Sequence, residues 1–215
     1  MLTILYLVFT VLLVVFTVQA VQLYKGNRSS YTLILLAVLS GLAYDNLVIA
    51  VGSMLGEGGL LKSLNTGRFV IHALFTPAMS IFGFGVLREA GVTWAQGKTA
   101  HVVVCVFTTL LIALGVFTDI FRLDLQPRVL LDALRYVNEG GMKGPPIPAI
   151  LTIFFLIGAG ISLWRKTGFK WLALGALFMF IAAAMGMGDM VYISNLGEVV
   201  LGFVNVYTAK KYLSS

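Results

Sequence analysis

Residues 1–24 read MLTILYLVFTVLLVVFTVQAVQLY, a stretch without a single charged side chain. About 20 consecutive apolar residues are enough for an α-helix to cross the hydrocarbon core of a bilayer. A cleaved signal sequence normally starts with basic residues and has a shorter apolar core. Residues 18–20, Val-Gln-Ala, resemble a cleavage site, but the length of the stretch favours a retained first span at 2–23.

Similar apolar stretches recur along the rest of the chain. Of its 215 residues, 59% are hydrophobic and 11% are charged, whereas about a quarter of the residues in soluble domains are charged. The sequence therefore predicts an all-α polytopic membrane protein, a single integral membrane domain (1–215) built as a seven-transmembrane-helix bundle. The expected spans are 2–23, 31–54, 67–87, 100–118, 147–164, 169–188 and 193–209, and a tight turn at 186–189 separates the last two.

Segment 119–146 mixes charged and apolar residues. After Pro127, five apolar residues fall near one face of a helix, while most of the charged residues fall elsewhere; the apolar set is Val129, Leu130, Leu131, Leu134 and Val137. This pattern is typical of an amphipathic helix lying at the membrane interface. We therefore expect a short interfacial helix at 128–139 between spans four and five, then a glycine- and proline-rich hinge at 140–148.

The formal net charge is +6, but the Lys and Arg residues lie mainly at span ends and form no dense cluster. This distribution argues against nucleic-acid binding. It fits the rule that the cytoplasmic loops of membrane proteins carry an excess of basic residues. An external N-terminus puts nine of the 15 Lys and Arg residues inside: Lys25, Arg28, Arg88, Lys98, Arg165, Lys166, Lys170, Lys210 and Lys211. We expect a plasma-membrane protein with its C-terminus in the cytoplasm. Cys105 is the only cysteine in the sequence, so no disulfide can form within the chain.

Ionisable residues inside spans are costly, so each is a candidate functional residue. Asp45 shares a helical face with Ala37 and Gly41, and small residues of this kind pack against neighbouring helices. We expect Asp45 to point into the bundle. A purely structural ion pair or hydrogen-bonded acid is the alternative.

The third span carries Arg68, His72, Thr76 and Ser80, spaced four residues apart. On a helix this spacing gives one polar stripe. Pro77 removes a backbone hydrogen bond and loosens the helix beside it. In the alternative interpretation, Arg68 reaches toward the interface and the hydroxyl groups bond to their own helix.

The last span places Asn195, Glu198, Gly202 and Asn205 on one face. Asn195 with Glu198 also fits a capping box, which would make the pair structural. Asp119 and Asp189 end spans four and six, and the alternative for each is a solvated span end. Together the acids, Arg68 and His72 predict an outward-facing intramembrane polar pocket.

Two carboxylates and an imidazole suit general acid–base chemistry, and an arginine suits a phosphate or developing anion. We therefore expect an enzyme, such as an intramembrane lipid hydrolase, that acts on a lipid or other amphiphile. Its catalytic residues would be Asp45, His72 and Asp189. Its substrate-binding residues would be Arg68, Thr76, Glu198, Asn205 and Asn46.

Two other functions stay open: a small-solute or proton-coupled transporter, and a sensor or assembly factor with structural polar groups. The expected partners are membrane lipids. No cofactor can be named and no metal is assigned, because two histidines cannot make a three-histidine zinc centre. A mixed His/Asp/Glu metal site remains compatible with the sequence.

Two segments, GALFMFIAAAMGMGDMVYISN and VLGFVNVYTAKKYL, resemble the end of the lysoplasmalogenase family. SGLAYDNLVIAVG and RFVIHAL resemble its earlier aspartate and later histidine segments. The resemblance implies that Asp45 and Asp189 are paired acids. This chain has Tyr44 before Asp45, where the family usually has glycine, and one span fewer, so we assign no membership.

Overall fold

The computed structural model describes residues 1–141, 146–186 and 188–214, with Asp189 described by its backbone only. Residues 142–145 of the predicted hinge and Met187 of the predicted turn lie outside the described residues. The described chain is mainly helical, which confirms the all-α class. Its elements in chain order are α1 (Leu2–Asn27), α2 (Ser30–Leu55), α3 (Gly59–Glu89), η1 (Thr93–Gln96), α4 (Lys98–Gly115), η2 (Val116–Ile120), β1 (Leu125–Leu130), β2 (Ala133–Asn138), α5 (Ile147–Thr167), α6 (Trp171–Met185), η3 (Gly188–Met190) and α7 (Val191–Tyr212).

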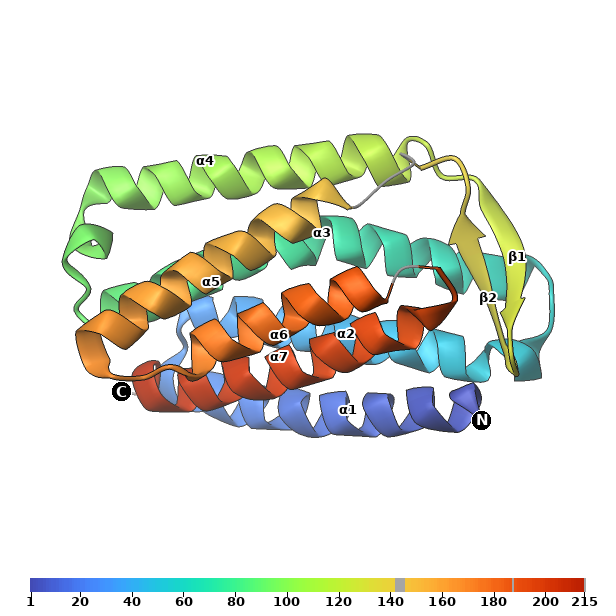
Figure 1. Cartoon of the computed structure of the whole chain (residues 1–215), viewed down its shortest axis with the longest axis horizontal. Coiled ribbons are helices and arrows are strands. Elements are labelled where there is room, and N and C mark those ends of the chain that lie inside the picture. The colour runs from blue at the N-terminus through green and yellow to red at the C-terminus, as the bar shows by residue number, and fades with distance from the viewer. Residues whose placement is uncertain (142–145, 187, 215) are drawn as a thin grey trace.

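The helices lie side by side along the long axis of the molecule (Figure 1). α1 packs on α2 and α7, α2 packs on α3, and α3 contacts α4 and α5. α5, α6 and α7 follow one another in contact. α6 ends at Met185 and α7 begins at Val191, so the two helices are separate, as the predicted spans require. The N-terminus and the two strands occupy one end of the bundle, hereafter the hairpin end, and the C-terminus lies at the opposite end (Figure 1).

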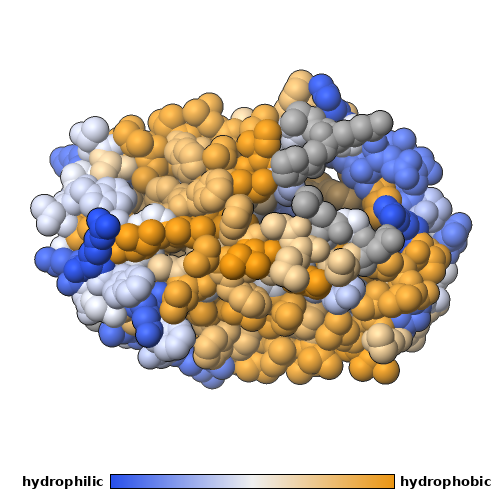
Figure 2. All heavy atoms as spheres, in the orientation of Figure 1, coloured by the Kyte–Doolittle hydropathy of each residue, from blue (hydrophilic) through white to orange (hydrophobic). Residues whose placement is uncertain are grey.

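Five helical segments of the described chain are long and apolar enough to cross a membrane: α1, α2, α3, α4 with η2 (Lys98–Ile120), and α5. α6 is apolar but has only 15 residues. The visible face shows hydrophobic atoms in a broad band between more hydrophilic ends (Figure 2). These features are consistent with a membrane-embedded protein, while the count of seven crossings stays a prediction.

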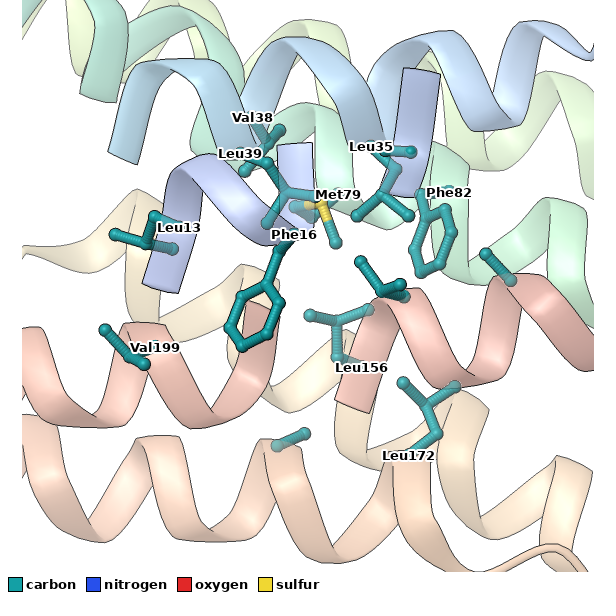
Figure 3. Close-up of a cluster of buried hydrophobic side chains, with 14 of the residues drawn as sticks. Leu13, Phe16, Leu35, Val38, Leu39, Met79, Phe82, Leu156, Leu172 and Val199 are labelled. Atoms are coloured by element: carbon teal, nitrogen blue, oxygen red, sulfur yellow. The ribbon is translucent and has the colours of Figure 1, made fainter. Parts of the chain in front are cut away.

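A core of buried apolar side chains runs through the middle of the bundle (Figure 3). Six helices contribute to the part that Figure 3 labels: Leu13 and Phe16 of α1, Leu35, Val38 and Leu39 of α2, Met79 and Phe82 of α3, Leu156 of α5, Leu172 of α6 and Val199 of α7. Because apolar contacts between helices compete with equally apolar lipid tails, close packing rather than hydrophobicity alone stabilises such a bundle in a bilayer.

The prediction of an interfacial helix at 128–139 is wrong, because these residues belong to an antiparallel hairpin of β1 and β2. Its turn at Leu131 has a φ of 53°, which a right-handed helix does not contain. Leu134 and Tyr136 alternate along β2 and pack on Val48 and Leu61. The apolar run 129–131 covers the end of β1 and the first residue of the turn, so its spacing resembles one helical face although no helix forms.

The hairpin is attached to the bundle by hydrogen bonds as well as by apolar contacts. Ser53 Oγ of α2 donates to the Asp132 carbonyl at 2.6 Å and accepts from Leu134 N at 2.9 Å. The Asp132 carboxylate accepts from Leu2 N at 2.7 Å and pairs with the Met1 amine. A Cβ at Gly52 would lie 1.8 Å from the Leu134 carbonyl oxygen, so only glycine permits this approach.

Candidate functional site

Asp45 lies on α2 near the hairpin end and is only 1% exposed. The small face that carries it packs on α3, since a Cβ at Gly41 would lie 2.5 Å from Ile71 Cγ2. This close approach of α2 and α3 brings the carboxylate against the polar stripe of α3. Asp45 therefore faces protein, and its environment consists of side chains that can compensate its charge.

The Arg68 guanidinium is the nearest cation to Asp45. Arg68 Nε donates to Asp45 Oδ1 at 2.7 Å, and Arg68 Nη1 donates to Asn65 Oδ1 at 2.7 Å. Arg68 is itself only 9% exposed, so it does not extend to the interface as the alternative interpretation proposed. The two charges form a buried ion pair that Asn65 holds in place.

His72 lies one helical turn beyond Arg68 and contacts the same carboxylate oxygen. Its Nε2 is 3.4 Å from Asp45 Oδ1, and its Nδ1 is 3.4 Å from Thr76 Oγ1. In contrast to Asp45, the His72 side chain is 36% exposed. The stripe on α3 thus runs from a buried ion pair to a partly accessible imidazole.

α7 supplies the third wall of this cluster. Asn195 Nδ2 lies 3.4 Å from Asp45 Oδ2 and 3.5 Å from Glu198 Oε2, so one amide links the two acids. The capping-box alternative is wrong, because α7 begins at Val191 and has Met190 as its N-cap. Ligand atoms of Asp45, His72 and Glu198 all lie within 4.8 Å of one another, an arrangement that can hold a metal ion.

The hairpin covers this cluster from its end of the bundle. Asn65 Oδ1, which binds Arg68, also accepts from Tyr136 N at 3.2 Å. Arg135 lies in electrostatic range of Arg68, Asp45 and Tyr6, and burial lowers the pKa of its guanidinium. Within the described ranges, Arg135 Nε and Tyr6 Oη are buried without a hydrogen-bond partner.

Sequence reasoning missed Asn65, Arg135 and Tyr6. Asn65 had a signal, because it precedes Arg68 by three residues and His72 by seven and so shares their face. Tyr6 and Arg135 had none, since they join the cluster through contacts between distant parts of the chain.

The other predicted site residues lie apart from the cluster or are not described. Asn46 Nδ2 donates to the Leu42 carbonyl of its own helix at 2.9 Å. Asn205 and Ser80 lie two turns farther along α7 and α3, and both have a buried polar atom for which the described part of the chain offers no partner. Asp119, in η2, is in electrostatic range of His72. Nothing is described of the Asp189 side chain, so its pairing with Asp45 stays a prediction.

An apolar groove lies between the same two helices that carry Asp45 and His72. It is lined by Leu33, Ile34, Ala37, Val38, Phe75 and Ala78. Ala37 stands two turns before Asp45 on α2, and Phe75 follows His72 by three residues on α3. The groove and the polar cluster are thus neighbouring features of one helix pair.

The fold and the site together define a helical, membrane-type protein with a buried carboxylate–guanidinium–imidazole cluster. No protein-family model matches the chain, and no curated protein sequence matches it. The resemblance to the lysoplasmalogenase family therefore stays a prediction, and function is argued below from the cluster itself.

Proposed function

We propose that this chain is a seven-span membrane protein and that its polar cluster is the active site of a hydrolase for amphiphilic lipids. The excess of Lys and Arg at the end opposite the hairpin supports an external hairpin end and a cytoplasmic C-terminus in the plasma membrane. In that orientation the cluster is reached from the outer leaflet or the external solution.

The accessibility of His72 carries the proposal. It is the partly exposed imidazole in contact with a fully buried carboxylate, the arrangement in which an acid orients a general base. Asp45, fixed by Arg68, orients His72, and Glu198 is a second carboxylate for proton transfer. Asp189 is a further candidate acid.

The proposed reaction is hydrolysis of an ester-type bond. His72 accepts a proton from water while the water oxygen bonds to the carbonyl carbon. The ester carbon–oxygen bond then breaks, and the proton passes from His72 to the leaving alcohol. Water is the only co-reactant, so no oxidant or reductant is required.

Arg135 favours a substrate that carries an anionic group. Its buried Nε has no hydrogen-bond partner within the described ranges. A buried donor without an acceptor is energetically costly, and an anion would supply both charge and an acceptor atom. Arg68 is less available, because its Nε and Nη1 already bind Asp45 and Asn65. The groove lined by Ala37 and Phe75 would accommodate part of an acyl chain.

The test is hydrolysis of a panel of anionic and neutral phospholipids and lysolipids by the purified full chain, with products measured by mass spectrometry. We expect turnover that is lost in His72→Gln and Asp45→Asn. His101→Gln is the matched control, because His101 contacts Arg88 at the opposite end. Arg135→Gln should raise KM for anionic lipids more than it lowers kcat. Absence of turnover across the panel, or equal activity of His72→Gln and wild type, contradicts the proposal.

Proton-coupled transport is the second candidate, and Ser80 and Asn205 favour it. Their buried oxygen atoms, which have no hydrogen-bond partner among the described residues, lie farther along the helices of His72 and Glu198, in the direction a through-path would take. Solute-driven proton uptake into proteoliposomes, lost in Glu198→Gln, would support transport over hydrolysis. A sensor or assembly factor predicts neither signal and a similar loss of folded protein in every cluster variant.

A further inference from the structure

We infer that Asp45, His72 and Glu198 form a binding site for one divalent transition-metal cation of the Zn²⁺ or Mn²⁺ type. Each residue comes from a different helix, α2, α3 or α7, and their ligand atoms lie within 4.8 Å of one another. This inference is separate from the hydrolase proposal, in which His72 acts as a base in the metal-free protein, and metal binding is measured directly.

The donor set suits such a cation. Imidazole nitrogen and carboxylate oxygen bind Zn²⁺ at about 2.0–2.2 Å, which separates tetrahedral ligand atoms by about 3.4 Å. The side chains therefore need to approach by no more than about 1.5 Å, within the reach of side-chain rotation. One imidazole and two carboxylates form a mixed nitrogen–oxygen site, and carboxylates also favour Mn²⁺.

Residues around the three ligands already hold them in a suitable orientation. A hydrogen bond from His72 Nδ1 to Thr76 Oγ1 would leave the Nε2 lone pair directed toward Asp45, where a metal would bind. Metal-binding histidines usually have such a partner on their other ring nitrogen. Asn195 fixes one oxygen of Asp45 and one of Glu198, so the two acids converge.

Charge in the cluster points the same way. Arg68 compensates Asp45 at 2.7 Å, but Glu198 has only the neutral Asn195 amide as a hydrogen-bond partner in the described structure. Glu198 is only partly buried, and the nearby His72 imidazole is neutral unless it is protonated. Carboxylates that are shielded from water are usually paired or coordinate a metal. A divalent cation would neutralise the charge of Glu198 and would also be coordinated by a carboxylate oxygen of Asp45.

Three protein ligands would leave the cation a fourth position for water. Zinc sites that catalyse reactions have three protein ligands and a fourth position for water or substrate, whereas structural sites are closed. With three protein ligands, one of them on a side chain that is 36% exposed, the site has the ligand number of the open kind.

The experiment uses the purified full chain in detergent after removal of metals with a chelator. Co²⁺ is titrated by visible absorption, and Zn²⁺ and Mn²⁺ by calorimetry. We expect one equivalent of metal per chain, with binding lost in His72→Gln and in Glu198→Gln. Thr76→Val, which retains all three ligands, should weaken binding by about 10- to 100-fold. His101→Gln should bind like wild type.

Wild-type protein that binds none of the three cations at one equivalent overturns the inference, whatever the variants do. Equal binding by wild type and Glu198→Gln overturns it as well, and thermal unfolding of each variant shows whether it is folded. Lipid hydrolysis that continues in protein that binds no metal would overturn the metal site and leave the hydrolase proposal standing. Metal binding without hydrolysis would do the reverse.

Discussion

Replacing Arg68 by methionine should destabilise the protein strongly, because it leaves the Asp45 carboxylate buried without its cation. Methionine retains much of the apolar stem and removes the guanidinium. Asp45 is 1% exposed and Arg68 9% exposed, so water cannot replace the lost contact without a rearrangement. The substitution therefore isolates the charge interaction from packing.

The magnitude follows from the geometry. At 2.7 Å and an effective dielectric constant of about 20, the gross attraction between two unit charges is about 6 kcal/mol. Most of it offsets the desolvation of both groups, and removing one partner of a buried pair costs about 3–5 kcal/mol. For a chain of this length, each kcal/mol lowers Tm by about 2–4 °C, so the expected drop is about 6–20 °C.

The assay is thermal unfolding in detergent, followed by fluorescence and by size-exclusion chromatography. Asp45→Asn/Arg68→Met should recover much of the loss, with a coupling energy of about 2–3 kcal/mol. Arg122→Met is the matched control, since Arg122 is an exposed arginine that lies over the Phe117 ring at 5.1 Å. A drop in Tm of less than about 2 °C for Arg68→Met would refute the ion pair. So would a double variant whose loss of stability equals the sum of the losses in the two single variants.

Two further predictions concern the hairpin. Gly52→Ala should detach β2 from α2 because its Cβ would overlap the Leu134 carbonyl, and faster amide exchange at Leu134 and Tyr136 would reveal this; Gly59→Ala, with nothing near its Cβ, should have no such effect. The Met1 amine lowers the pKa of Asp132 to about 2, so the contact persists above the ordinary aspartate pKa of about 4 and is lost as the pH falls toward 2. The rate at which pepsin cleaves the hairpin should therefore increase as the pH falls over that range. In the Asp132→Asn variant this rate should not change between pH 4 and pH 2.

The helices were predictable because each one is specified by its own residues. An uninterrupted apolar stretch predicts a helix whatever surrounds it, and the four-residue spacing of Arg68, His72 and Thr76 places them on one face of any helix. The partners of that face were predictable only in part. Asp45 had a face of small residues to indicate contact with a helix, but nothing in the sequence specified α3 as that helix.

The hairpin was not predictable for a related reason. Residues 129–137 fit a helical period and an alternating strand period about equally well, and the choice depends on contacts far away in sequence. Ser53 supplies a donor and an acceptor to the turn, and Gly52 leaves space for the Leu134 carbonyl. Arg135 and Tyr6 reach the cluster through this placement, so their role became visible only in three dimensions.

The composition of the cluster distinguishes a structural role from a functional one. A structural ion pair between α2 and α3 needs only Asp45 and Arg68, which satisfy each other and are fully buried. Glu198 and His72 add nothing that this pair requires, and Glu198 introduces a second negative charge beside the first. Because a second carboxylate that is partly shielded from water beside the first is unfavourable, we propose that these two residues bind a ligand, proton or metal, which would enter beside the partly exposed His72.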